Sequence, residues 1–270
     1  MREVAFGQYY PGNSFVHRCD PRAKILFLVF YITAIFVGQN FYTLGACAFV
    51  FFVVALFSGV PFKSLLQSVK AILFLLIFMT VLNLFFYEGE TVLWQWGFIT
   101  LTQEAVYYTI FLAVRLFLLV LGSSLLTLTT TPVSLADGIE SLLSPLKVIR
   151  FPVHELALIM SIALRFIPIL TDETARIMNA QKARGADFET GGLVKRVKAI
   201  IPTLIPLLIS AFRRSEELGD AMDARCYSGS KVRTKYKRLT FGWRDAVALS
   251  LVLVLLVGVI VLRFHTSALV

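Results

Sequence analysis

The chain has 270 residues, of which 57% are hydrophobic and only 16% are charged. Soluble domains carry about 25% charged residues, so this composition excludes an ordinary soluble domain and indicates a protein embedded in a bilayer. The net charge is +9, but most of the basic residues lie beside apolar stretches, where the positive-inside rule accounts for them, and we expect no nucleic-acid partner.

The N-terminal arm is polar and ends in Asp20-Pro21, a capping residue followed by a first-turn proline, which predicts the start of a helix. Five apolar stretches follow, and we expect each to cross the bilayer, although the first two are near the short end of the roughly 20 residues that a helical span needs. These stretches are residues 25–37, 42–57, 71–86, 105–128 and 246–262.

Lysine and arginine predict the orientation. They occur in the N-terminal arm, in the second connection and in residues 147–244, whereas the first and third connections contain none. The positive-inside rule therefore places these three basic regions in the cytoplasm. With five spans, the C-terminus would lie outside the cell.

The long insertion before the last span predicts three helices that do not cross the membrane. The first begins at Thr131-Pro132 and is amphipathic, and the second begins at Pro152 and contains Glu155, Arg165 and Pro168. An ionised group at bilayer depth costs about 2.5 to 3.5 kcal/mol, which argues against a span there. The third, after Gly191-Gly192, has an apolar core too short to cross.

The predicted fold is therefore an all-α membrane protein with about five transmembrane helices and a cytoplasmic domain of three helices. The predicted divisions are residues 1–130 for the arm and four spans, 131–240 for the three cytoplasmic helices, and 241–270 for the last span.

The pattern Ala-x-x-Ala-Arg occurs twice in the insertion, and each copy ends a predicted helix. Small alanines leave a slim helix face, and arginine offers a planar fork that binds a carboxylate through two hydrogen bonds. One interpretation is a pair of docking tips for a duplicated partner, and the other is two ordinary capped helix ends. The residues concerned are Ala183, Arg184 and Gly185 in the first tip and Ala224, Arg225 and Cys226 in the second.

Residues 7–14 read Gly-Gln-Tyr-Tyr-Pro-Gly-Asn-Ser, and residues 17–24 read His-Arg-Cys-Asp-Pro-Arg-Ala-Lys. This opening segment resembles the signature of the transmembrane T components of energy-coupling factor (ECF) transporters. The resemblance extends over essentially the whole chain, including residues 165–168 (Arg-Phe-Ile-Pro), both arginine tips and the final span.

The resemblance implies a non-catalytic scaffold in the cell membrane. Its partners would be two ATPases of the ATP-binding cassette type, which bind ATP and Mg²⁺, and an S component that binds a vitamin or a metal ion, of which the family analogy favours a vitamin. It implies that Arg184 and Arg225 seat in grooves of the two ATPases, and that this chain carries no cofactor of its own. Cys226 departs from the first tip, which has Gly185 at the same place.

The apolar faces of the cytoplasmic helices need cover, because exposed apolar patches of this kind mark interaction surfaces. We expect these faces to contact the S component or one another. The candidate residues are Leu156, Ile159, Ala163, Leu204, Leu207 and Leu208.

The alternative function is a stand-alone secondary transporter or channel. Such proteins place ionisable residues at a site near the membrane midplane, and this sequence offers mainly Arg115, for which we expect a structural pairing with polar atoms such as those of Asn83. The sequence has no G-x-x-x-x-G-K-[ST] phosphate loop, no H-E-x-x-H and no G-x-S-x-G motif. Its three cysteines form no C-x-x-C pair and predict neither a disulfide framework nor a metal site.

Overall fold

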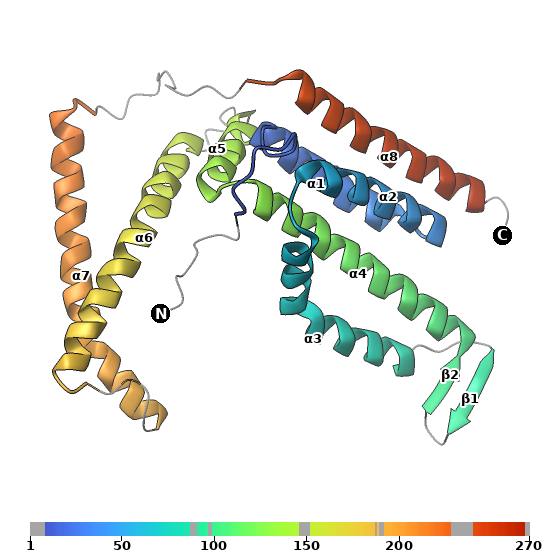
Figure 1. The fold of residues 1–270 in the computed structure, drawn as a ribbon, viewed down its shortest axis with the longest axis horizontal. Helices are drawn as coiled ribbons and strands as arrows, with labels where there is room; N and C mark the ends of the chain where they lie inside the picture. The colour runs from blue at the N-terminus through green and yellow to red at the C-terminus, as the bar shows by residue number, and fades with distance from the viewer. Residues whose placement is uncertain are drawn as a thin grey trace. The chain divides into compact units, whose positions relative to one another are not determined.

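The computed structural model describes residues 9–86, 91–96, 99–145, 152–186, 188, 192–227 and 240–267 (Figure 1). Its elements are α1 (Pro21–Val37), α2 (Phe41–Ser58), α3 (Phe62–Phe86), β1 (Val92–Trp96), β2 (Ile99–Thr102), α4 (Gln103–Thr129), α5 (Pro132–Leu142), α6 (Val153–Ala183), α7 (Leu193–Ala224) and α8 (Trp243–Ser267). The chain divides into two compact units, which we describe separately. The first contains Met1–Val153 and Leu239–Val270, and the second contains His154–Arg238.

The helix starts predicted from capping residues are confirmed. The Asp20 carboxylate accepts a hydrogen bond from the backbone N–H of Arg22 at the start of α1, with Pro21 in the first turn. Thr131 caps α5 in the same way by accepting from the N–H of Ser134. These side chains satisfy N–H groups that have no partner within the helix.

The core of the first unit lies among α1, α2, α4 and α8. Tyr31 and Ile35 of α1 are buried there together with residues such as Leu44 of α2 and Val252 of α8. Gly122 allows α4 to approach Tyr31 of α1 closely, because a Cβ atom at position 122 would lie 2.7 Å from Cε1 of Tyr31. A larger residue at Gly122 would have to displace this buried aromatic ring.

Asp245 joins the starts of two helices that are far apart in sequence. Its side chain is 3% exposed. One carboxylate oxygen accepts from the backbone N–H of Asp20 at 2.7 Å, and the other accepts from the N–H of Gly242 at 2.8 Å. The N-terminal ends of α1 and α8 therefore lie side by side, and the two helices run in the same direction.

Lys24 attaches the end of α4 to the same place. Its buried amine donates to the carbonyl oxygens of Thr129 (3.0 Å) and His17 (3.3 Å) and to the hydroxyl of Thr130 (3.2 Å). The backbone N–H of Tyr10 donates to the carbonyl of Leu128 at 2.9 Å. The N-terminal arm thus closes over the end of α4. We call Asp20, Lys24, Thr129, Thr130 and Asp245 the polar junction.

The connection between α3 and α4 contains a short antiparallel hairpin of β1 and β2. The sequence predicts no strand here, so the hairpin is an addition to the predicted all-α fold, and the other described elements are helices. β1 reads Val-Leu-Trp-Gln-Trp, and β-branched and aromatic residues favour strands. α3 itself bends by 60° between its halves, Phe62–Lys70 and Ile72–Phe86.

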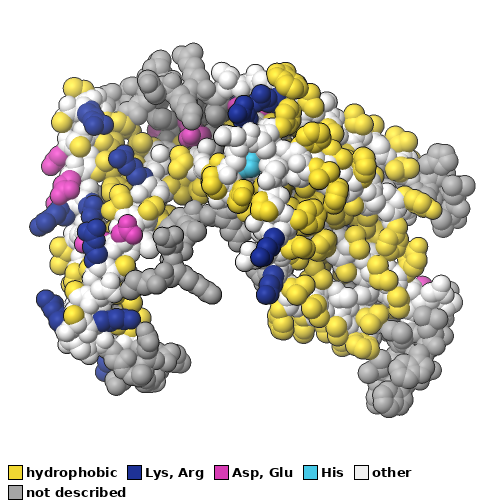
Figure 2. Space-filling view, viewed as in Figure 1, with side chains coloured by type: hydrophobic (Ala, Val, Ile, Leu, Met, Phe, Trp, Pro, Cys, Tyr) yellow, Lys and Arg dark blue, Asp and Glu magenta, His cyan; other side chains and the backbone are white. Residues whose placement is uncertain are grey.

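Three helices of the described chain are long and apolar enough to cross a membrane, namely α2, α4 and the Trp243–Phe264 part of α8, and the bent α3 makes a fourth if its two halves form one span. α1 has 17 residues, or about 25 Å of helix against a hydrocarbon core of about 30 Å. Hydrophobic side chains dominate the surface over these helices (Figure 2). The protein is therefore embedded in a membrane.

The second unit consists of α6 and α7. Gln181 of α6 donates to the carbonyl of Pro202 at 3.5 Å, and Glu173 forms an ion pair with Arg214 at 3.5 Å. Later residues of α6 thus meet earlier residues of α7, so the helices run antiparallel where they touch. α5 belongs to the first unit and packs on α1, whereas the predicted division at residue 131 places it with the cytoplasmic helices.

Candidate functional site

The first arginine tip is a Schellman helix end. The N–H of Ala186 donates to the carbonyl of Gln181 at 3.0 Å, and the N–H of Gly185 donates to that of Lys182 at 3.0 Å. Gly185 has φ +87°, the left-handed conformation that this motif requires. Arg184 is therefore the last residue before the chain reverses.

The second tip has the same geometry. The N–H of Tyr227 donates to the carbonyl of Met222 at 3.0 Å, and the N–H of Cys226 donates to that of Asp223 at 2.9 Å. Cys226 takes the left-handed place with φ +58°, the only non-glycine residue with positive φ in the part of the chain that the structure describes. The sequence departure at Cys226 thus leaves the shape of the helix end unchanged, and Arg225 occupies the position of Arg184.

All six predicted tip residues are exposed. The tips lie on different parts of the second unit, because Gln181, three residues before Arg184, touches Pro202, and α7 continues from there to Arg225. At a rise of about 1.5 Å per residue, this part of α7 is about 35 Å long. Figure 1 shows the ends of α6 and α7 at opposite ends of the helix pair. The arrangement therefore presents two equivalent guanidinium groups at separate places.

An apolar stripe runs along the first half of α7. Its members are between 45% and 64% exposed, and we call them the α7 stripe: Ile200, Ile201, Leu204, Ile205, Leu208, Ile209 and Phe212. Of the predicted contact residues, Leu204 and Leu208 belong to the stripe, and Leu207 is half-buried. Leu156, Ile159 and Ala163 are exposed on α6. The structure thus places the candidates on both helices of the second unit.

Arg115 has the structural pairing that the sequence predicts, but with other atoms than those of Asn83. Its guanidinium donates to the carbonyl of Gly38 and lies 4.6 Å from the ring centroid of Phe111. The Asn83 amide instead donates to the carbonyl of Met79 in its own helix. These contacts place the Arg115 guanidinium between α4 and the end of α1.

The remaining candidates for chemistry in the described residues are the Cys19 thiol and any cluster of metal-binding side chains. Burial raises the pKa of the Cys19 thiol, with the charge of Asp245 as a second cause, so the thiol stays protonated at neutral pH. Within the described ranges, no three His, Cys, Asp or Glu side chains come together as metal ligands. The arginine tips and the α7 stripe are therefore the features that remain to be explained by partners.

Comparison with known proteins identifies the family. The family described as CbiQ, cobalt transport protein, matches residues 12–236. The relatives include the energy-coupling factor transporter transmembrane protein EcfT of Ruminiclostridium cellulolyticum, 46% identical over 98% of both chains. EcfT of Brevibacillus brevis is 48% identical over 96% of this chain and 98% of its own, and EcfT of Acidaminococcus fermentans is 46% identical over 99% and 100%.

The chain belongs to the ECF T-component family. The resemblance first seen in the opening segment is thus confirmed over nearly the full length. Sequence reasoning identified that segment but missed what it does in this T component, which is to carry Asp20 and Lys24 into the polar junction. Asp245 was missed altogether, because no local pattern connects it with a residue 225 positions earlier.

We predict that Cys226→Gly strengthens the second tip. A left-handed backbone costs a non-glycine residue about 1 to 2 kcal/mol, and glycine avoids this cost. Hydrogen exchange at the Tyr227 amide, which reports the Schellman bond, should slow by about fivefold or more. The reciprocal Gly185→Cys should speed exchange at Ala186 by a similar factor. Unchanged exchange in both variants would contradict the assigned caps.

Proposed function

We propose that this T component is the coupling subunit of an ATP-driven importer. Two partner ATPases bind ATP and Mg²⁺ and hydrolyse the nucleotide, and an S component binds the cargo, for which we propose a vitamin. The observation that carries the proposal is the pair of exposed arginines on two helix ends with the same hydrogen-bond pattern. A duplicated contact is suited to a duplicated partner, and the separation along α7 leaves room for one ATPase domain at each tip.

The chemistry of the tips supports this role. A Schellman end turns the chain away from the helix axis, so that Arg184 and Arg225 project at the last helical turn with exposed side chains. Each guanidinium can then bind an acidic group of an ATPase groove through two hydrogen bonds. When the ATPases close and reopen, they would move α6 and α7 relative to one another and so change the surface offered to the S component.

We predict that Arg184→Ala and Arg225→Ala each weaken ATPase binding and that the double variant abolishes ATP-driven uptake. Removing one arginine leaves a partner carboxylate buried and unpaired, which costs about 2 to 5 kcal/mol. Lysine should substitute poorly, because a point charge does not reproduce the planar fork. The measurements are ATPase pull-down and uptake into reconstituted vesicles.

The matched controls are exposed arginines within the same helices, Arg176→Ala in α6 and Arg213→Ala in α7. Both should retain assembly and uptake. Full assembly and uptake by the double tip variant would reduce the repeat to two ordinary helix ends and reject the docking role.

We also propose that five segments cross the membrane, with the N-terminus in the cytoplasm and the C-terminus outside. The directions of four helices support this arrangement, because the starts of α1 and α8 lie at the same end of the unit as the ends of α2 and α4. Lys24 joins α1 to Thr129, Asp245 joins α8 to Asp20, and a Cβ at Gly59 after α2 would lie 3.6 Å from Ser14 of the arm. α1 and α8 therefore run opposite to α2 and α4, as an alternation of five spans that includes α3 requires.

This topology predicts the accessibility of single cysteines introduced into a version without Cys19, Cys47 and Cys226. An impermeant maleimide applied to intact cells should label Glu88→Cys, in the third connection outside the described residues. It should label Asp220→Cys of α7 only after the membrane is permeabilised. External labelling of Asp220→Cys would reject the five-span arrangement.

The α7 stripe is the proposed contact for the S component. Seven large apolar side chains on one helix, each about half exposed or more, form a surface that water solvates poorly and a membrane partner can cover. A second candidate contact surface for the S component lies on α6 of the same unit, where Leu156, Ile159 and Ala163 are exposed.

We predict that Leu204→Glu and Leu208→Glu release the S component while both ATPases stay bound. A carboxylate placed in an apolar interface loses its hydration without gaining a partner. Co-purification of each subunit measures the effect, and Ser215→Glu, at an exposed polar position of α7, is the control. Retention of the S component by both leucine variants would place its contact elsewhere.

A further inference from the structure

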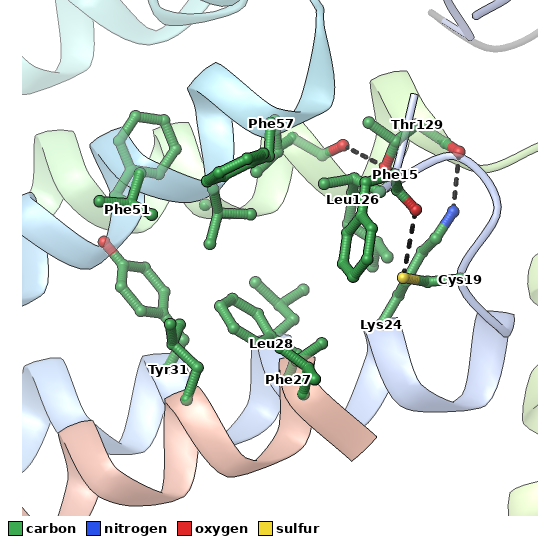
Figure 3. A pocket seen from close by; sticks show the side chains of 18 of the residues that line it. Phe15, Cys19, Lys24, Phe27, Leu28, Tyr31, Phe51, Phe57, Leu126 and Thr129 are labelled. Atoms are coloured by element: carbon green, nitrogen blue, oxygen red, sulfur yellow. Dashed lines mark hydrogen bonds between the residues drawn. The ribbon is translucent and has the colours of Figure 1, made fainter. Parts of the chain in front are cut away.

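The first unit contains an apolar cavity of about 320 Å³ between the N-terminal arm and helices α1, α2, α4 and α8 (Figure 3). Aromatic and aliphatic side chains such as Phe27, Leu28 and Leu126 form its wall. A volume of this size is in the range of small-molecule pockets. The cavity can therefore hold an apolar group about as large as a substantial part of a lipid acyl chain.

The cavity opens toward the outer surface of the helices where α2 and α8 meet. Three of its lining residues are among the exposed hydrophobics of the protein: Phe57 of α2 is 63% exposed, and Trp243 and Val247 of α8 are 69% and 47% exposed. α2 and α8 are both long and apolar enough to cross a bilayer. The surroundings of this opening are consequently lipid, and an acyl chain can enter without crossing water.

The rim carries a cation with no carboxylate partner among the described residues. The Arg244 guanidinium lies 5.9 Å from the ring centroid of Phe15 and 5.9 Å from that of Trp243, and both rings line the cavity. The acidic groups at this end have other partners. Asp245 accepts two backbone N–H bonds, and Asp20 is engaged with Arg22.

Lys24 also lines the cavity, but its amine already donates to three oxygen atoms of the protein. An ammonium has three donors, so Lys24 has none left for a ligand. The interior of the cavity is then suited to hydrocarbon alone. Arg244 provides a cationic group at the rim, beside a tryptophan of the kind that anchors at the level of lipid headgroups.

We propose that this cavity binds an anionic phospholipid, with an acyl chain inside and the headgroup phosphate on Arg244. Arginine suits this task because its planar fork binds two phosphate oxygens at once. The bound lipid fills space beside Tyr31, Gly122 and the polar junction, where four helices and the arm meet. The proposal needs only that the protein lies in a membrane and is independent of the contacts proposed for ATPases and the S component.

Trp243 provides a built-in reporter. The chain has three tryptophans, so the double change Trp94→Phe and Trp96→Phe leaves Trp243 alone. The full chain is reconstituted in vesicles that contain increasing fractions of phosphatidylglycerol or phosphatidylcholine with brominated acyl chains, which quench tryptophan fluorescence on contact. We expect an apparent affinity about tenfold higher for phosphatidylglycerol, the size of one charge-assisted contact.

Two variants separate the contribution of the lipid headgroup from that of the acyl chain, and each has a control on the same helix. Arg244→Gln should bring the preference close to one, and Arg263→Gln near the other end of α8 should leave it near tenfold. Ala248→Phe fills the cavity and should lower quenching by both lipids. Ala246→Phe, at an exposed position two residues away that does not line the cavity, should not.

Native mass spectrometry of the same proteins gives an independent readout, since a retained anionic lipid adds its mass to the wild-type chain and is lost from Arg244→Gln. If Ala248→Phe unfolds, this comparison alone decides. Equal quenching by the two lipids in the wild type, or a tenfold preference that survives Arg244→Gln, would overturn the proposal, as would retention of phosphatidylcholine in place of the anionic lipid.

Discussion

The fold of the first unit depends on two buried charges at one end of the helices. Asp245 accepts hydrogen bonds from two backbone N–H groups, and the amine of Lys24 donates to three oxygens. A buried charge that loses such partners keeps its desolvation cost without compensation. The ends of α1, α4 and α8 are therefore held at a common level, which apolar packing alone does not specify, because helices in a bilayer slide past one another with little change in buried area.

The second unit has polar contacts of a different kind, which are exposed to solvent rather than buried. Two of the polar contacts between α6 and α7 are a 3.5 Å hydrogen bond and a 3.5 Å ion pair, both of exposed or partly exposed side chains. Exposed ion pairs contribute at most about 1 kcal/mol, so these two contacts fix the crossing of the helices weakly. Neither of these two contacts buries a charge, whereas the polar junction buries both the Lys24 amine and the Asp245 carboxylate.

Local patterns in the sequence predicted much of this structure. Capping residues beside prolines located the starts of α1 and α5, and the Ala-x-x-Ala-Arg repeat located both helix ends before their geometry was known. The features that the sequence did not predict depend on contacts between distant residues or on a backbone conformation that is unusual for the residue. Asp245 meets Asp20 only in the folded chain, α5 joins α1 through the space left by Gly138, and the left-handed backbone at Cys226 contradicts the preference of its own side chain.

The left-handed backbone of Cys226, directly after Arg225, indicates which property the two tips share. A cysteine held at φ +58° shows that the hydrogen bonds of the Schellman end outweigh the local preference of the residue. The repeated property of the two tips is thus the direction of the chain at the arginine rather than the residue after it. The helix dipole stabilises a cation at a helix C-terminus even without a partner. The free energy gained when a partner carboxylate binds the arginine is therefore only the difference between the bound arginine and the arginine in water at the helix end. The two Schellman ends therefore fix where each guanidinium group projects, and this holds whether or not an acidic group of a partner meets it.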